Sequence, residues 1–336
     1  MRMKMLALLV TVGLGPAGAA NRTSAADVWF SFPPKTDFMD LFRKPDQWPA
    51  SLQGIDAFML QSSFVYRSSD KQLAEIVGFL RKHGVKLALE AQMMRLGPNR
   101  CGQGIEGYKP PGYMRTVFQK LKAAGADLDF VAMDEPLWFG RLAKRKSRFG
   151  GSCQFSLLEL AQNLRQSVSE LLELYPRAEI GDEETIRSPA IDRDMPSGYL
   201  FEIEKWLAAF EQETGSKIRF LHWDVAWFPA KNSEMDKLNS NYWTATLESA
   251  VTMGRTHEIR TGIFYDGDPG DVASAAWNAH AIARYKAVED ELHIMTDTAV
   301  FATWMHCPER ALPESDPATL SYLARSYIRD RDGRIR

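Results

Sequence analysis

The chain has 336 residues, of which 45% are hydrophobic and 25% are charged, a globular composition that can bury a large core. Its formal net charge is −2, which argues against a general nucleic-acid binder, so we expect no nucleic-acid partner.

The first twenty residues form a predicted secretory signal peptide. Arg2 and Lys4 give a basic start, residues 5–15 are an apolar run, and residues 17–19 are small enough to suit a cleavage site. The apolar run is too short for a permanent membrane anchor, and no other segment approaches that length. We therefore expect a secreted or periplasmic protein without a membrane partner.

From residue 27 onward, apolar runs alternate eight times with helical patterns. Eight strand–helix units in a chain of this size predict a single (β/α)8 TIM barrel over residues 21–336, and we expect a monomer. A doubly wound open sheet is the alternative, but such sheets often carry a glycine-rich phosphate loop, and the sequence has no GxGxxG or P-loop motif. The predicted strands are residues 28–32, 57–61, 86–91, 129–133, 178–181, 219–223, 262–265 and 299–304.

Two predicted loops are long, one after the third strand (residues 95–112) and one after the fourth (residues 137–155). In a barrel both lie at the catalytic face, where long loops shape a substrate cleft. Cys101 and Cys153 fall in these loops, so we predict that they form a disulfide and that Cys307 stays free. The cysteine spacing matches no zinc motif, and we predict no metal and no cofactor.

The stretch from residue 128 to 140 is the centre of the predicted site. Residues 128–133 are a continuous apolar run, Asp134 and Glu135 follow at once, and Pro136 ends the strand. Chemistry in parallel α/β folds sits at the C-terminal ends of strands, which favours a working carboxylate pair. The alternative is that Asp134 caps a turn and Glu135 pairs with a basic residue.

The other predicted strand ends also carry mainly carboxylates and aromatic residues, as glycoside hydrolysis requires. That reaction needs one protonated carboxyl as acid and one ionised carboxylate as nucleophile or base, and crowding raises the pKa of one of them. Aromatic rings supply flat faces for sugars. We predict Glu135, Asp266 and Glu183 as catalytic residues. The predicted substrate-binding residues are Gln61, Glu90, Asp134, Trp138, His222, Trp223, Asp224, Trp227, Tyr265 and Trp304.

Core packing is the alternative for every aromatic residue. We prefer it for Trp206, Trp243 and Trp277, which fall inside helical stretches. For the tryptophans at or just beyond strand ends, both interpretations stay open.

The segment FVAMDEPLWFG resembles the fourth-strand motif of the clan A (β/α)8 glycoside hydrolases, in which Asn-Glu-Pro closes that strand. GIFYDGD and FATWMH resemble the seventh- and eighth-strand segments of the same superfamily. The resemblance implies that Glu135 is the acid/base, that Asp134 replaces the Asn, and that Trp304 is the eighth-strand Trp. Where the family has a nucleophilic Glu on the seventh strand, this chain has Asp266, and Glu183 is the rival second carboxylate.

Two alternatives remain beside a secreted glycoside hydrolase, and the role of the basic loop is also open. A barrel that binds glycans without cleaving them is consistent with the missing seventh-strand Glu. An enolase-like magnesium site from Glu90, Glu135 and Glu183 lacks a lysine base near the second or sixth strand end. Finally, the basic run at residues 141–148 is either a solvated loop or an arm that attracts an anionic glycan such as a uronate-containing exopolysaccharide.

Overall fold

The computed structural model describes residues 25–33, 35, 37–144, 146–147, 150–186, 198–225, 227 and 233–335. The predicted signal peptide lies outside the described residues, and so do Arg145 and Arg148 of the basic run. Within the described part of the chain, no helix has both the length and the apolar character needed to cross a bilayer.

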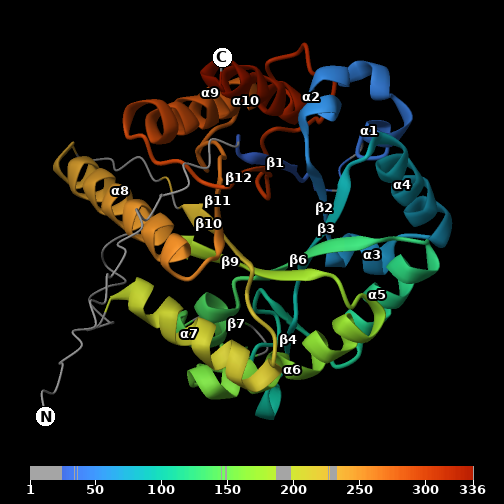
Figure 1. Ribbon diagram of the computed structural model, residues 1–336, viewed down its shortest axis with the longest axis vertical. Coiled ribbons are helices and arrows are strands. Elements are labelled where there is room, and N and C mark those ends of the chain that lie inside the picture. The colour runs from blue at the N-terminus through green and yellow to red at the C-terminus, as the bar shows by residue number, and fades with distance from the viewer. Residues whose placement is uncertain are drawn as a thin grey trace, which may run out of the picture.

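Eight parallel strands close into a barrel, which confirms the predicted (β/α)8 fold and excludes the open sheet (Figure 1). The barrel strands follow one another around the ring in the order β1, β2, β3, β6, β9, β10, β11 and β12, and β12 pairs with β1. Their bounds are β1 Asp27–Phe30, β2 Ala57–Gln61, β3 Lys86–Ala91, β6 Leu128–Asp134, β9 Glu179–Ile186, β10 Phe220–Val225, β11 Arg260–Phe264 and β12 Thr298–Phe301.

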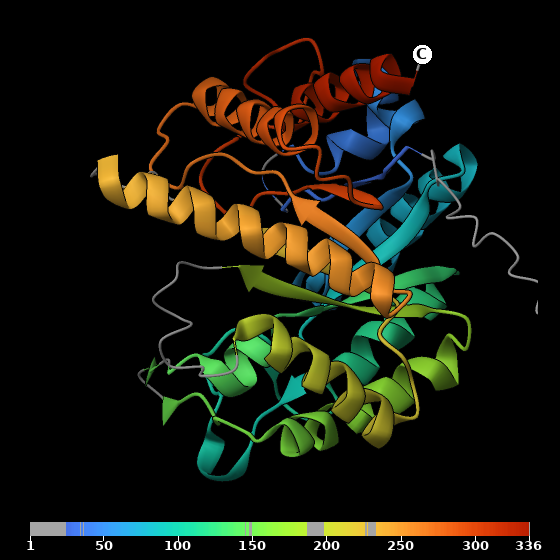
Figure 2. The ribbon, with the colours of Figure 1, turned by 60° about the vertical axis from the view of Figure 1, so that its left-hand side comes forward.

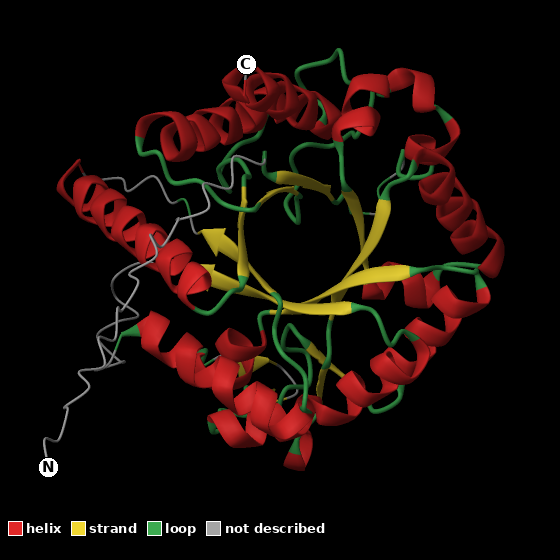
Figure 3. Cartoon of the chain, in the orientation of Figure 1, coloured by secondary structure: helices red, strands yellow, loops and turns green. Residues whose placement is uncertain are grey.

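Helices surround this ring on the outside (Figure 3). Their bounds are α1 Asp40–Arg43, α2 Pro49–Gly54, α3 Ser62–Arg67, α4 Asp70–His83, α5 Tyr113–Ala123, α6 Leu157–Leu174, α7 Tyr199–Thr214, α8 Ser233–Thr256, α9 Ser274–Tyr285 and α10 Leu320–Ile335. The shorter elements are the 3₁₀ turns η1 Pro45–Gln47 and η2 Pro98–Arg100, the π-helical turns η3 Trp138–Leu142 and η5 Lys286–Glu291, and the strands β4 Met94–Arg95, β5 Tyr108–Lys109, β7 Lys146–Ser147 and β8 Gly150–Gly151.

The helices begin and end where the sequence supplies caps. Ser156 accepts a hydrogen bond from the Glu159 amide and the Glu159 side chain returns one, so α6 begins with a capping box. Gly84 ends α4 in the left-handed conformation. Figure 2 shows α8 running along the outside of the barrel, and it contacts β10 and β11.

Strand side chains alternate between the barrel interior and the helix layer. The interior cluster takes residues from seven strands, and β9 contributes Gly181, where a Cβ would meet the Phe220 ring. The members of this interior cluster are Trp29, Ala57, Met59, Ala88, Phe130, Ala132, Phe220, Phe264, Val300 and Ala302. The barrel is therefore filled at its centre, and any site must lie above this cluster at the C-terminal ends of the strands.

Strand β9 is longer than predicted, because it continues through Asp182, Glu183 and Glu184 to Ile186. The two outward-facing acidic residues, Asp182 and Glu184, fit in the strand because their side chains accept hydrogen bonds from buried donors. Asp182 accepts a hydrogen bond from Trp206 Nε1 at 2.7 Å, and Glu184 accepts one from the Leu137 amide at 2.5 Å.

The two long loops are joined as predicted by a disulfide between Cys101 and Cys153. Cys307 is free and buried, which is also as predicted. Gly97 packs against the bridge, since a Cβ there would lie 2.5 Å from Cys101 Sγ and 2.9 Å from Cys153 Sγ. The bridge therefore fixes the loop after β3 to the loop after β6 at one face of the barrel.

Candidate active site

Three carboxylates from adjacent strands enter the upper part of the barrel interior. Glu90 lies two residues beyond the interior Ala88 on β3, Asp134 two beyond Ala132 on β6, and Glu183 two beyond Gly181 on β9. Asp134 and Glu183 are register partners across the β6–β9 pair. Asp134 is 8% exposed and Glu183 is 6% exposed. We call Glu90, Asp134 and Glu183 the carboxylate group.

The barrel interior favours the protonated forms of this group. Burial raises the pKa of Glu90 to about 7; the Gln61 amide, which donates to Glu90 Oε2 at 3.5 Å, opposes the shift and Glu106 adds to it. Burial also raises the pKa of Asp134 well above its ordinary value, reinforced by Glu90 and Glu106. The pKa of Glu183 rises well above its ordinary value through burial, then through Glu90, Asp134 and Glu135. Interacting carboxyls of this kind titrate as one unit.

Several buried polar atoms beside the group have no hydrogen-bond partner among the described residues. These are Asp134 Oδ2, Glu183 Oε1, Thr185 Oγ1 and both ring nitrogens of His222. His222 is the register partner of Glu183 and is fully buried, which together with Arg260 lowers its pKa to about 3, so the ring is neutral. Because buried polar atoms normally have partners, these atoms can accept or donate to a bound substrate.

Glu135 directly follows Asp134 at the end of β6. Its φ of 42° is uncommon for a residue with a side chain, and such strained residues cluster at functional sites. The Glu135 amide donates to the Glu183 carbonyl at 3.0 Å. Its charge raises the pKa values of Glu183 on the interior face of β9, and of Asp182 and Tyr199 on the helix side. Glu135 therefore lies between the barrel interior and α7.

Asp266, the other predicted catalytic carboxylate, belongs to a different cluster. Its carbonyl accepts a hydrogen bond from Arg284 Nη1 at 2.5 Å, and its carboxylate lies 3.5 Å from the same nitrogen. Burial and then Asp224 raise the pKa of Asp266, while Arg284 lowers it. Neither Asp266 nor Asp224 is among the main charges that shift the pKa of Glu90, Asp134 or Glu183.

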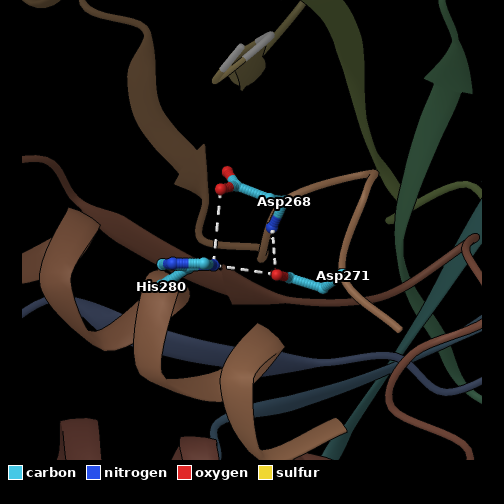
Figure 4. Close-up of side chains that lie close together, drawn as sticks. All are labelled: Asp268, Asp271 and His280. Atoms are coloured by element: carbon cyan, nitrogen blue, oxygen red, sulfur yellow. Dashed lines mark hydrogen bonds and ion pairs between the residues drawn. The ribbon is translucent and has the colours of Figure 1, made fainter. Parts of the chain in front are cut away.

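Asp268, Asp271 and His280 form a network in the loop beyond Asp266 (Figure 4). Among the described residues, they are the one set of three acidic, histidine or cysteine side chains whose candidate ligand atoms all lie within 4.8 Å. His280 Nδ1 is 2.8 Å from Asp271 and 3.3 Å from Asp268, and Arg284 also contacts Asp268. Because the carboxylates already have these partners, the network ties the loop to α9 and gives no reason to assign a metal.

The predicted aromatic residues separate into core and surface positions. Trp223 and Tyr265 are fully buried against the helix layer, and the Tyr265 hydroxyl donates to Glu289 at 2.9 Å. We therefore remove both from the candidate site: their strand positions face outward, which corrects the sequence-based assignment. Trp227 is 7% exposed and donates from Nε1 to the Phe264 carbonyl at 3.3 Å. Trp304 is 48% exposed above Phe264, beyond the end of β12.

The other tryptophans named in the sequence analysis differ in how far the structure describes them. Trp206 and Trp277 are fully buried in the core, as predicted. The side chain of Trp243 lies outside the described residues. Trp138 is half-buried at the start of η3, and its amide donates to Glu184 at 3.1 Å.

A pocket of about 510 Å³ adjoins the carboxylate group and was not predicted. It connects with the group because Gln92 hydrogen-bonds to Asp134, while Glu106 and Lys109 act electrostatically on Asp134. The signal available in the sequence was the long glycine-rich loop after the third strand, which supplies most of the lining. The lining residues are Gln92, Leu96, Gln103, Gly104, Ile105, Glu106, Tyr108, Lys109 and Pro110.

Comparison with known proteins gives only distant similarities. No family model matches the sequence, and no curated protein matches it. Among solved structures, a 3-deoxy-D-arabino-heptulosonate 7-phosphate synthase from Thermotoga maritima is similar at 9% identity with a TM-score of 0.48, over 93% of this chain and 89% of that one. A psychrophilic glycoside hydrolase family 10 endo-β-1,4-xylanase is similar at 10% identity with a TM-score of 0.46, over 84% and 86% of the two chains.

A D-psicose 3-epimerase determined in the presence of D-fructose is similar at 10% identity with a TM-score of 0.44, over 90% of this chain and 97% of that one. These three enzymes catalyse different reactions, and at such identities they say nothing of the chemistry of this chain. The function must be argued from the site.

Proposed function

We propose that the protein is a glycoside hydrolase whose acid and base come from the carboxylate group. The observation that supports this proposal is the placement of Glu90, Asp134 and Glu183 on three adjacent strands, where Asp134 and Glu183 are buried, Glu90 is partly buried, and the three are electrostatically coupled. Such coupling keeps protonated and ionised carboxyls side by side near neutral pH, which is what glycosidic bond cleavage requires.

Glu183 is the proposed proton donor. It lies between Asp134 and His222 in the strand register, and four neighbouring carboxylates disfavour its ionised form. Its proton would pass to the glycosidic oxygen as the bond to the sugar breaks. Glu90, with a pKa of about 7, is the proposed ionised partner, which acts on the sugar carbon as nucleophile or through a water molecule.

The test is activity of the protein without residues 1–20 on a panel of polysaccharides, followed by release of reducing ends. Glu183→Gln and Glu90→Gln should each reduce kcat/KM by about 10²–10⁴-fold, because a positioned acid or base contributes that much. Glu248→Gln is the matched control, since it makes the same chemical change at an exposed position on α8, outside the carboxylate group.

Glu135 and Asp266 are tested in the same series. If Glu135→Gln loses activity and Glu183→Gln does not, the acid is Glu135, as the resemblance implies. If Asp266→Asn loses activity and Glu90→Gln does not, the second carboxylate is Asp266. Full activity in all four amide variants would refute the proposal.

A glycan-binding barrel without catalysis is the second candidate. The observation in its favour is the ion pair of Asp266 with Arg284 at the position where the resembling family has its nucleophile. This candidate predicts that the protein binds an oligosaccharide from the panel and releases no product from it, even in long incubations.

A further inference from the structure

Arg67 and Lys109 are two cations without ion pairs in the described ranges, and Lys109 acts electrostatically on Asp134 of the carboxylate group. Arg67 ends α3, directly after β2, and Lys109 lies on β5 in the loop after β3. Neither forms an ion pair with any residue in the described ranges. Arg67 is exposed and Lys109 is partly buried. Both therefore keep their charge available to a ligand.

The two charges lie close enough to act on each other. Burial lowers the pKa of Lys109, Asp134 opposes this shift, and the positive charge of Arg67 adds to it. Holding two like charges near one another costs free energy unless an anion binds between them. Asp134 is the carboxylate that offsets this repulsion at Lys109, and burial together with Glu90 and Glu106 raises the pKa of Asp134 well above its ordinary value.

An aromatic surface lies beside the same two cations. Tyr66 and Tyr113 stack with ring centroids 4.5 Å apart and planes 21° apart, and Tyr66 is 45% exposed. Lys109 Nζ lies 5.2 Å from the centre of the Tyr113 ring. A flat aromatic face next to a cation suits a sugar ring that carries an anionic substituent, because the ring packs on the aromatic face while the anion reaches the cation.

The pocket next to the carboxylate group places such a sugar within reach of the chemistry. Its volume of about 510 Å³ is in the range of small-molecule sites, and Lys109 and Gln92 both line it. Gln92 in turn hydrogen-bonds to Asp134. A ligand anchored at Lys109 would therefore extend along Gln92 toward the carboxylates.

We propose that Arg67 and Lys109 form a subsite for the carboxylate of a uronate residue in an acidic glycan. This inference rests on the proposed function for the identity of the ligand as a glycan, and it deepens it by naming the substrate class. Arg67 supplies a planar guanidinium that matches a carboxylate, and Lys109 supplies a second, point-like charge.

The test is a binding measurement, which does not depend on turnover. Titration calorimetry compares galacturonate and glucuronate oligosaccharides with neutral hexose oligosaccharides of the same length. Wild type should bind one of the uronate series at least about 10-fold more tightly than the neutral series, and this preference should weaken as salt is raised. Arg67→Gln combined with Lys109→Gln should abolish the preference for the uronate series.

Lys71→Gln combined with Arg165→Gln is the matched control, since it removes the same two charges from exposed positions on α4 and α6. It should keep the uronate preference. Equal affinity for acidic and neutral oligosaccharides in wild type, or an undiminished preference in a folded Arg67/Lys109 double variant, would overturn the inference. A preference for sulfated over uronate oligosaccharides would overturn the carboxylate assignment. Uronate binding through these residues without cleavage would leave the subsite standing and refute the proposed hydrolase.

Discussion

At the scale of single residues, Glu90 links the proposed chemistry to stability. Its pKa is raised mainly by burial, from 4.5 to about 7. A carboxyl whose folded pKa is raised binds its proton more tightly in the folded state. Its contribution to stability is therefore fully present below pH 4.5 and is lost as the pH rises from 4.5 through about 7.

Glu90→Gln is expected to remove this pH dependence. The amide cannot ionise, so the variant should gain stability relative to wild type between pH 4.5 and 7.5, by at most about 3 kcal/mol because partial exposure of Glu90 screens the charge. Urea unfolding across this pH range measures the difference. Glu248→Gln makes the same chemical change at an exposed position on α8 and is the control. A constant difference between Glu90→Gln and wild type across the range would contradict the assigned pKa.

His222, at the same site, contributes a pH dependence of stability that is opposite in sign to that of Glu90. Its pKa falls to about 3 when the ring is buried, so the unfolded chain binds a proton below about pH 6.5 while the folded chain does not. Stability from this residue is lost as the pH falls from about 6.5 toward 3. Between pH 4.5 and 6.5 Glu90 and His222 therefore change the free energy of unfolding in opposite directions as the pH rises. Single variants are needed to separate the two contributions.

At the scale of elements, β9 shows where prediction from sequence stops. The run Asp182–Glu183–Glu184 is typical of a loop, and only residues 178–181 were predicted as strand. The strand extends because Trp206 on α7 and the amides after β6 meet the outward carboxylates. Those partners lie 24 to 47 residues away in sequence, so no local pattern can reveal them. In contrast, Glu90 and Asp134 followed strongly apolar runs and were placed correctly at strand ends.

The disulfide between the two long loops can be removed by substitution, which tests its contribution to stability and binding. Cys101→Ser combined with Cys153→Ser opens a loop with a sequence separation of 52 residues and should lower the free energy of unfolding by roughly 2–4 kcal/mol. Because the loop after β3 lines the pocket, affinity for oligosaccharides should fall as well. The measurements are thermal unfolding with and without reductant and titration calorimetry. Cys307→Ser is the control, and reductant should not change the affinity of the double variant.

At the scale of the whole molecule, the barrel was predictable because counting strand–helix units needs no side-chain detail. The side chains that gather at the C-terminal ends of its strands were less predictable. Arg67 and Lys109 belong to a short helix and to a two-residue strand in a loop. In such short elements the hydrophobic periodicity does not show which way a side chain points. Trp223 and Tyr265 were assigned to the site from their strand ends, but the alternation of the barrel turns both toward the helices. A site formed at strand ends needs the register of each strand, which the closed sheet supplies.

The strand register is compatible only with side chains that fit together in the filled centre of the barrel. The variant Gly181→Ala tests this packing. A Cβ at Gly181 would overlap the Phe220 ring, so Gly181→Ala should lower stability by about 1–3 kcal/mol through overpacking. Gly78→Ala on α4 is the matched control: a Cβ there meets nothing within 4 Å, and a helical glycine replaced by alanine should raise stability by up to about 1 kcal/mol. Urea unfolding with an unchanged m-value measures both.

Because Glu183 lies two residues beyond Gly181 on the same face, Gly181→Ala should also reduce activity more than Gly78→Ala does. Wild-type stability in Gly181→Ala would mean that the interior is not packed at this level, and the placement of the carboxylate group above it would lose its support.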